Sequence, residues 1–404
     1  MSDRVIIVGG GPAGMVAGLL FARAGVRVTV LEKHKDFLRD FRGDTVHPST
    51  LELFNDIGLL EELLKEPHAA IDTMTLNLLG QQYTIATMTH LPVAARFVAM
   101  MPQWDLLDFV AGQGRRYPTF ELRMSTEATG LTYDDGGRVN GVTLASGETL
   151  PARLVIAADG RRSILRDAAE LPLEDLGAPM DVLWFRIPVP AGMDMSEVAL
   201  GTIDKGGMVV AIPRGDYWQC ARIIEKGGFA PIEARGIAAF RDEIVAIAPG
   251  LAAGIGAIES FDDVKLLSVA LDRLTRWSRP GLLAIGDAAH AMSPVGGVGI
   301  NLAVQDAVAA ANILAAPLAA GAGPDPLLAK VQERRWTPTT RMQGLQRFAH
   351  RNIIEPMLRG EITRVPLAVR LLDRIPFLRR IPGRVLGLGF GRQHVQSPLA
   401  KEFS

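Results

Sequence analysis

The first residues that could bind a cofactor form a glycine-rich turn near the N-terminus, Gly9-x-Gly11-x-x-Gly14. In such a turn the first glycine permits a tight bend, the second lets the backbone approach a pyrophosphate, and the third allows a helix to pack closely on a strand. Glu32 follows about 20 residues later, where a carboxylate accepts hydrogen bonds from a ribose diol. Together these residues predict a dinucleotide site.

A second group of residues that could bind a cofactor lies much later in the chain, between Gly281 and Leu302. Asp287 is expected to end a strand, where its carboxylate suits the hydroxyls of a ribityl chain. The glycines at 296 and 297 would let backbone amides approach a flat ring system. A helix that begins near Gly299 would direct the positive end of its dipole at an anion formed there, such as a reduced flavin.

The elements that must position these groups alternate strand and helix. Residues 4–8 and 26–31 are apolar runs typical of buried parallel strands, and Pro12 to Ala24 between them predicts a helix closed by Gly25. Residues 281–285 predict another buried strand, followed by a long apolar helix from Gly299 to Leu318. Separated segments of one parallel sheet therefore carry both groups of chemical residues.

The intervening sequence has a different pattern. Residues 71–90 suggest a hairpin, and the stretch from Asp181 to about Asp272 is rich in strands with one helix near 231–247. Further helices are expected near 49–64 and 103–115. The predicted fold class is α/β, with a Rossmann-type (glutathione-reductase-like) domain, an inserted antiparallel-sheet domain and a C-terminal helical segment.

This pattern divides the chain into three parts. The dinucleotide domain is expected to be discontinuous, the inserted substrate domain to contain a mixed sheet, and the last segment to be helical. The expected limits are 1–70, 99–180 and 271–330 for the first, 71–98 and 181–270 for the second, and 331–404 for the third.

Composition narrows the class of protein. The chain has 404 residues, 48% of them hydrophobic, and a formal net charge of −1, so no electrostatic argument supports a nucleic-acid partner. The single cysteine, Cys220, excludes an intrachain disulfide and a redox-active cysteine pair. No His, Asp or Glu cluster has metal-ligand spacing, so no metal site is expected. A soluble, cytoplasmic protein fits these features best.

Three motifs resemble those of the para-hydroxybenzoate hydroxylase family, the group A FAD-dependent aromatic monooxygenases. The motifs are GGGPAG at 9–14, ADGRRSILR at 158–166 and GDAAHAMSPVGGVGINLAVQDA at 286–307. The resemblance implies that FAD is bound by the glycine-rich turn, Glu32, Arg42, Gln103, Asp159 and Asp287. It also implies ring contacts near Pro294, whose carbonyl would face the substrate. The full set of expected FAD-binding residues is Gly9, Gly11, Pro12, Ala13, Gly14, Glu32, Lys33, Arg42, Gln103, Asp159, Asp287, Pro294, Gly297, Val298, Gly299 and Asn301.

The chemistry follows from the same resemblance. NADH or NADPH would reduce FAD, and O2 would then form a flavin hydroperoxide that hydroxylates a small aromatic substrate. A prenyl-chain reductase, a halogenase, an oxidase on the same scaffold, and a non-catalytic flavin-binding protein stay open as alternatives.

The residues that contact the substrate are harder to assign. Trp184, Met208, Trp218 and Arg222 lie on strands where the family builds its substrate pocket, so they are the substrate candidates. No residue is identified as a catalytic acid or base, and His47 and Pro294 are the weak candidates for a catalytic role.

The C-terminal segment from Arg334 to Arg392 is rich in arginine interleaved with apolar residues. The favoured interpretation is a helical cover or a homodimer face. The alternative is contact with an anionic membrane surface, which basic amphipathic segments can make.

Overall fold

The computed structural model describes residues 3–38, 45–193 and 200–400. Arg42, to which the resemblance assigns a cofactor contact, lies outside these residues.

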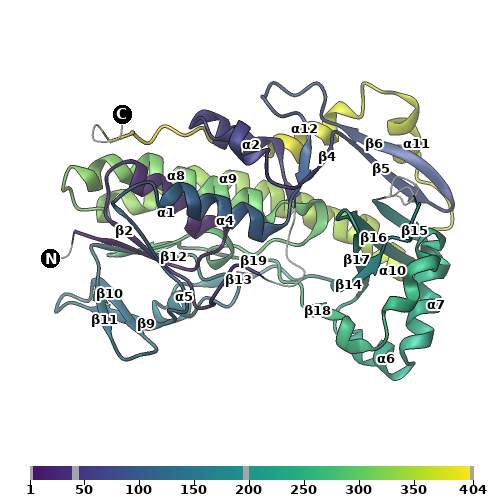
Figure 1. The fold of residues 1–404 in the computed structure, drawn as a ribbon, viewed down its shortest axis with the longest axis horizontal. Helices are drawn as coiled ribbons and strands as arrows, with labels where there is room; N and C mark the ends of the chain where they lie inside the picture. The colour runs from purple at the N-terminus through teal and green to yellow at the C-terminus, as the bar shows by residue number, and fades with distance from the viewer. Residues whose placement is uncertain (1–2, 39–44, 194–199, 401–404) are drawn as a thin grey trace.

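A six-stranded sheet is the centre of the nucleotide-binding layer (Figure 1). Its order is β20 (Ser278–Arg279), β21 (Leu282–Ala284), β12 (Leu154–Ala157), β1 (Val5–Val8), β2 (Val28–Leu31) and β8 (Phe120–Arg123). The five strands from β21 to β8 pair in parallel, and the four from β21 to β2 are buried along their whole length. Strands covered on both faces must be apolar throughout, which is why the predicted buried strands are confirmed.

Helices cover one face of this sheet. They are α1 (Pro12–Arg23), α4 (Gln103–Gly114), α8 (Gly299–Ala319) and α9 (Asp325–Ala349). α1 contacts both α4 and α8, and α9 lies along α8. One helical stretch of the described chain, Val295–Ala319, is long and apolar enough to span a membrane, but 72% of its apolar window is buried inside the fold. Its composition is therefore explained by its place in the core.

A seven-stranded sheet forms the second body of the molecule. Its order is β18 (Lys265–Leu267), β14 (Met180–Pro188), β17 (Tyr217–Glu225), β16 (Gly207–Pro213), β15 (Gly201–Asp204), β5 (Thr73–Leu78) and β6 (Gln81–Thr87). Neighbours are antiparallel except β15 and β5, whose pairing is parallel. That pairing joins the two inserted stretches into one mixed sheet, which supports the proposed domain division.

Two expected helices are each divided by a glycine. The helix expected near 49–64 is α2 (Pro48–Asp56) and α3 (Leu60–Leu63), separated at Gly58 with φ +74°. The helix expected near 231–247 is α6 (Phe229–Ala234) and α7 (Ile237–Ile247), separated at Gly236 with φ +85°. A positive φ is incompatible with a right-handed helix, so a single helix was wrong in both places.

Smaller elements complete these layers. They are β9 (Ala128–Tyr133), β10 (Val139–Leu144) and β11 (Thr149–Pro151) in one sheet, β3 (Thr45–Val46), β7 (Val98–Met100) and β4 (Ala69–Ile71) in another, the pair β13 (Leu173–Asp175) and β19 (Asp272–Leu274), and α5 (Ile164–Ala168).

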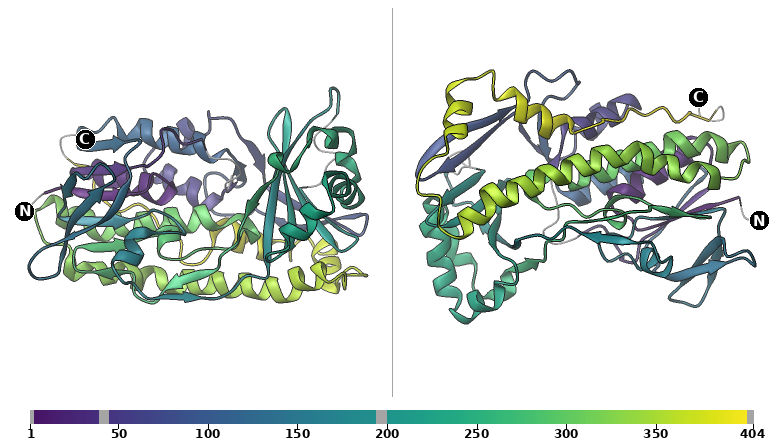
Figure 2. Two further views of the ribbon diagram at one scale, coloured as in Figure 1. Left: turned by 90° about the horizontal axis from the view of Figure 1, so that it is seen from below. Right: turned by 180° about the vertical axis from the view of Figure 1, so that it is seen from behind.

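The C-terminal part is helical, as expected. α9 runs from the six-stranded sheet toward the seven-stranded sheet (Figure 2) and continues through a π-helix, His350–Ile354, into α10 (Glu355–Leu358). α11 (Leu367–Arg374) and α12 (Arg380–Leu388) follow beside β6. α12 is a cover, since Gly383 lies so close to the Thr87 carbonyl that a Cβ would be 1.9 Å from its oxygen. α11 buries no residue.

Candidate flavin and substrate site

The parallel strands bring the predicted cofactor residues to one edge of the sheet. Asp287 follows β21, Asp159 follows β12, Gly9 follows β1 and Glu32 follows β2, and these four strands are consecutive neighbours. The carboxyl ends of parallel strands share an edge, so a single extended ligand can reach all four positions.

The turn between β1 and α1 has the shape that a pyrophosphate requires. Gly9 has φ +110°, and a Cβ there would lie 2.2 Å from the Ala158 carbonyl oxygen. A Cβ on Gly14 would lie 1.9 Å from the Gly9 carbonyl oxygen, whereas one on Gly11 would meet nothing within 4 Å. The chain is thus packed tightly behind the turn and open in front of it.

The start of α1 is also suited to an anion. No side chain of the described residues caps this end, and the first turn of the helix contains no acidic residue. Pro12 occupies the first helical position, where the lack of an N–H costs nothing, and Ala13 follows it. The free backbone N–H groups and the helix dipole therefore favour a phosphate at this end, so the residues present fit an FAD pyrophosphate.

Glu32 is held beside the turn. Its carboxylate accepts hydrogen bonds from the Gly10 N–H at 3.0 Å and from the His34 N–H at 3.0 Å. Its side chain is nearly buried, and the next residue, Lys33, is exposed. A carboxylate fixed in this way next to the phosphate turn can accept from a ribose hydroxyl.

Asp159 and Asp287 have different surroundings at the same edge. Asp159 accepts from Ser163 Oγ at 2.5 Å and from the Leu165 N–H at 3.3 Å, and burial raises its pKa despite these bonds. Asp287 is partly exposed, and its carboxylate lies 3.3 Å from Arg161 Nε. Asp287 therefore keeps acceptor capacity toward solvent, where a ribityl chain would pass.

The loop from Pro294 to Gly299 leads into α8. Gly296 and Gly297 have φ +82° and +62°, and a Cβ on Gly297 would lie 2.5 Å from Thr45 Oγ1. Val298 precedes the start of α8, which no side chain in the described part of the chain caps and whose first turn contains no acidic residue. This loop thus offers backbone N–H groups and a positive dipole end to a ring that binds against it.

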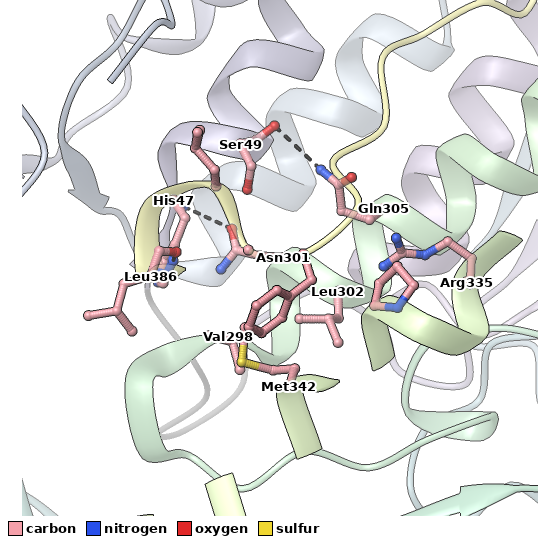
Figure 3. Close-up of a pocket in the computed structure, with 13 residues that line it drawn as sticks. His47, Ser49, Val298, Asn301, Leu302, Gln305, Arg335, Met342 and Leu386 are labelled. Carbon is pink, nitrogen blue, oxygen red and sulfur yellow. Dashed lines mark hydrogen bonds between the residues drawn. The ribbon is translucent and has the colours of Figure 1, made fainter. Parts of the chain in front are cut away.

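The Asn301 side chain holds the loop through hydrogen bonds. Its amide donates to the Thr45 and Gly297 carbonyls, both at 3.2 Å, and its oxygen accepts from Thr50 Oγ1 at 2.7 Å. The same oxygen accepts from the His47 N–H at 2.9 Å (Figure 3). The side chain therefore ties α8 to residues 45–50, and only its backbone is available to a flavin.

His47 is a buried neighbour of Asn301. Its Nδ1 donates to the Leu386 carbonyl at 2.6 Å, and burial lowers its pKa to about 4 although this bond opposes the shift. The cavity between His47, Asn301, Gln305 and Arg335 holds about one water molecule, far less than a flavin ring needs (Figure 3). This cavity is therefore too small to be the site of the flavin ring.

The predicted substrate residues divide between the two faces of the seven-stranded sheet. Trp184 and Met208 belong to the inner face, an apolar cluster that also contains Val295 of the cofactor loop and Leu386. Trp218 belongs to the outer face, which α7 covers, and Arg222 pairs there with Glu243 of α7 at 2.5 Å. The structure thus brings two of the four candidates toward the cofactor loop.

Two hydrogen-bond donors on the inner face have no acceptor within the described chain. They are Trp184 Nε1 and Gln219 Nε2, both fully buried. Gln219 pairs in register with Arg186, two residues along the strand from Trp184. Sequence reasoning missed Gln219, although a lone amide within an apolar strand was a signal.

Gln103, the last of the predicted cofactor residues, is the first residue of α4. Its neighbour on the chain, Trp104, packs against the main core. The position at a helix start is the one that the resemblance requires.

Fold and site together define a flavoprotein in which a Rossmann-type cofactor edge faces an apolar sheet. The chain belongs to the FAD binding domain family, whose sequence profile matches residues 3–344. It is 32% identical to 6-methylpretetramide 4-monooxygenase of Streptomyces rimosus, over 98% of this chain and 95% of that protein. It is also 27% identical to dialkyldecalin synthase of Streptomyces rugosporus, over 96% of this chain and 81% of that protein.

Solved structures share this fold. The crystal structure of PqsL, a probable FAD-dependent monooxygenase from Pseudomonas aeruginosa, matches with a TM-score of 0.73 and 21% identity, over 89% of this chain and 99% of that one. The chain is an FAD-dependent monooxygenase of aromatic compounds, as the three motifs predicted.

Proposed function

We propose that this monooxygenase uses NADH or NADPH and O2 to hydroxylate a fused-ring phenolic substrate. One observation carries the proposal: Trp184 and Met208 share an apolar cluster with Val295 of the cofactor loop. Apolar side chains packed beside the loop suit an aromatic ring system, and a relative of this chain is named for 6-methylpretetramide.

The buried donors refine the substrate class. Trp184 Nε1 and Gln219 Nε2 lie on the inner face and have no acceptor among the described residues, so a substrate with carbonyl or phenolic oxygens would satisfy them. A purely hydrocarbon ring would leave both donors unpaired. The expected substrate is therefore both polycyclic and oxygenated.

The proposed roles of the chain's residues are binding, orientation and exclusion of water. FAD, when bound, supplies the activation of O2 and accepts electrons from the nicotinamide. Gly9 to Gly14, Glu32, Asp159 and Asp287 would hold the nucleotide and ribityl parts, and the residues from Pro294 to Asn301 would position the ring. The apolar inner face would keep water from the reacting atoms.

We also propose a cytoplasmic location and a surface contact through α11. Buried Cys220 and the burial of the apolar stretch Val295–Ala319 support a cytoplasmic protein. A homodimer and a membrane-surface contact would both use α11, where Leu367 is 71% exposed beside exposed Arg370.

The test is anaerobic reduction of the bound flavin by NADH and by NADPH, with fused-ring phenols, single-ring phenols and aromatic acids compared. We expect fused-ring phenols to stimulate reduction most. Trp184→Leu should raise the half-saturating concentration about tenfold, because a buried aromatic side chain contributes ~1.5–3 kcal/mol.

Trp218→Leu is the matched control on the outer face, and it should lower thermal stability without changing that concentration. Reduction that no aromatic compound accelerates would contradict the proposed substrate class.

A further inference from the structure

The short segment Ser293–Val295 connects the Asp287 region to the two glycines of the cofactor loop, and all its backbone polar groups are bonded. The Ser293 N–H donates to Gln346 Oε1 at 3.1 Å, and Gln346 Nε2 donates to the Ser293 carbonyl at 2.8 Å and to the Val295 carbonyl at 2.9 Å. The Pro294 carbonyl accepts from the Gly297 N–H at 3.0 Å, and the Val295 N–H reaches Ser293 Oγ at 3.4 Å.

One side chain thus satisfies three of these five groups. Gln346 is buried in α9, and proline supplies no N–H at 294. Without Gln346 the two carbonyls and the Ser293 N–H would lose their partners in a buried place, which proteins avoid. The path of the segment therefore depends on Gln346.

His350 adds a second contact from the same helix face. Its Nε2 lies 2.8 Å from Ser293 Oγ, at the first residue of the π-helix. A π-helix is rare and often marks a functional site. Ile354 at the end of the π-helix and Met357 of α10 belong to the apolar cluster of the inner sheet face. One continuous helical stretch therefore contacts both the cofactor loop and the expected substrate surface.

We propose that Gln346 is a positioning residue that sets where the loop 293–297 lies against the flavin ring. The inference rests on the proposed cofactor role of this loop but on no particular substrate. Gln346 itself reaches the ring only through Ser293 and Val295. Its loss should leave the pyrophosphate contacts intact, because Gly9 and Glu32 follow other strands of the sheet, and Asp287 lies before the segment on the chain.

The experiment compares purified holoenzymes of Gln346→Met and Gln343→Met. Methionine keeps the volume and removes the hydrogen bonds. Gln343 is the matched control, since it is buried one turn earlier in α9 and donates to the Asp272 carbonyl at 2.7 Å and to the Ala291 carbonyl at 3.4 Å, outside the segment. We expect Gln346→Met to retain FAD but to shift the visible flavin absorption bands, while Gln343→Met keeps the wild-type spectrum.

Flavin reduction by NAD(P)H without substrate should also slow in Gln346→Met, by roughly tenfold to a hundredfold, because a misplacement near 1 Å has an effect of that size. This readout requires no hydroxylation. If the wild type hydroxylates no aromatic compound while the spectral difference persists, the proposed substrate fails and the positioning role stands.

The Gln346→Glu variant provides a second, independent test if the methionine variant does not fold. A protonated glutamic acid can accept from the Ser293 N–H and donate to one carbonyl, whereas the carboxylate repels both carbonyls. Its flavin spectrum should therefore approach the wild-type spectrum as the pH falls. Equal spectral changes in the Gln346→Met and Gln343→Met variants, or a pH-independent wild-type spectrum in Gln346→Glu, would overturn the proposal.

Discussion

At the scale of single residues, the carboxylates at the cofactor edge differ in how many hydrogen bonds they already accept from the protein. Glu32 and Asp159 each accept from protein donors and are largely buried, whereas Asp287 accepts from Arg161 Nε at 3.3 Å and is partly exposed. The carboxylate with the greatest free acceptor capacity should contribute most to cofactor affinity.

Asp287→Ala should therefore weaken FAD binding by about tenfold to a hundredfold, since a hydrogen bond to a charged group is worth ~1.5–3 kcal/mol. Titration of the apoprotein with FAD, followed by flavin fluorescence, measures the effect. Arg161→Gln is the control, because it removes the ion pair and leaves the carboxylate. An unchanged affinity in Asp287→Ala would place the ribityl chain elsewhere.

At the scale of elements, α8 and α9 are joined to the start of the cofactor motif by a buried charge network. Asp306 of α8 lies 2.7 Å from Arg335 Nε and 2.6 Å from His290 Nε2, and it accepts from the Gly286 N–H at 3.1 Å. Burial alone would raise the pKa of Asp306, but His290 and Arg335 outweigh burial and hold the pKa below its usual range. The network fixes both helices to the turn that carries Asp287.

Removing one partner of such a network leaves an uncompensated buried charge, so Arg335→Leu should lower the free energy of unfolding by about 3–5 kcal/mol. The adjacent Arg334 is exposed, and its one hydrogen bond among residues 3–38, 45–193 and 200–400 goes to Gln393 Oε1 at 2.8 Å. Arg334→Leu should therefore cost about 1 kcal/mol. Urea unfolding of both variants measures the two losses in the free energy of unfolding. Equal losses would show that the network contributes nothing specific to stability.

At the scale of the whole molecule, distant parts of the chain meet at His47. Its N–H bonds to Asn301 of α8 and its ring to the Leu386 carbonyl of α12. A histidine that is buried and neutral in the fold makes stability depend on pH, because the unfolded chain binds a proton more readily.

The pKa of His47 falls from 6.5 to about 4 on folding, so its contribution is fully present above about pH 6.5 and is lost as the pH falls toward 4. The loss should reach about 3 kcal/mol. Unfolding of the holoenzyme at several pH values in that range should show a shallower decline for His47→Gln than for the wild type. Identical pH profiles would mean that other groups govern acid stability.

The cofactor half of the protein was readable from sequence because its requirements are local. A glycine turn, the apolar strands on both sides of α1 and the Asp287 motif each lie within a short run of residues, and their order along the chain implies a parallel sheet. Arg42 belongs to residues 39–44, which lie outside what the structure describes.

The assignment of substrate residues depended on the tertiary structure. Strand periodicity shows that side chains alternate between two faces but not which face meets the cofactor, so Trp184 and Trp218 looked equivalent until α7 was seen to cover one face. The same limit explains Gln346, which is one of several polar residues along a helix in sequence. It acquires a role only because α9 lies against a segment 53 positions earlier in the chain.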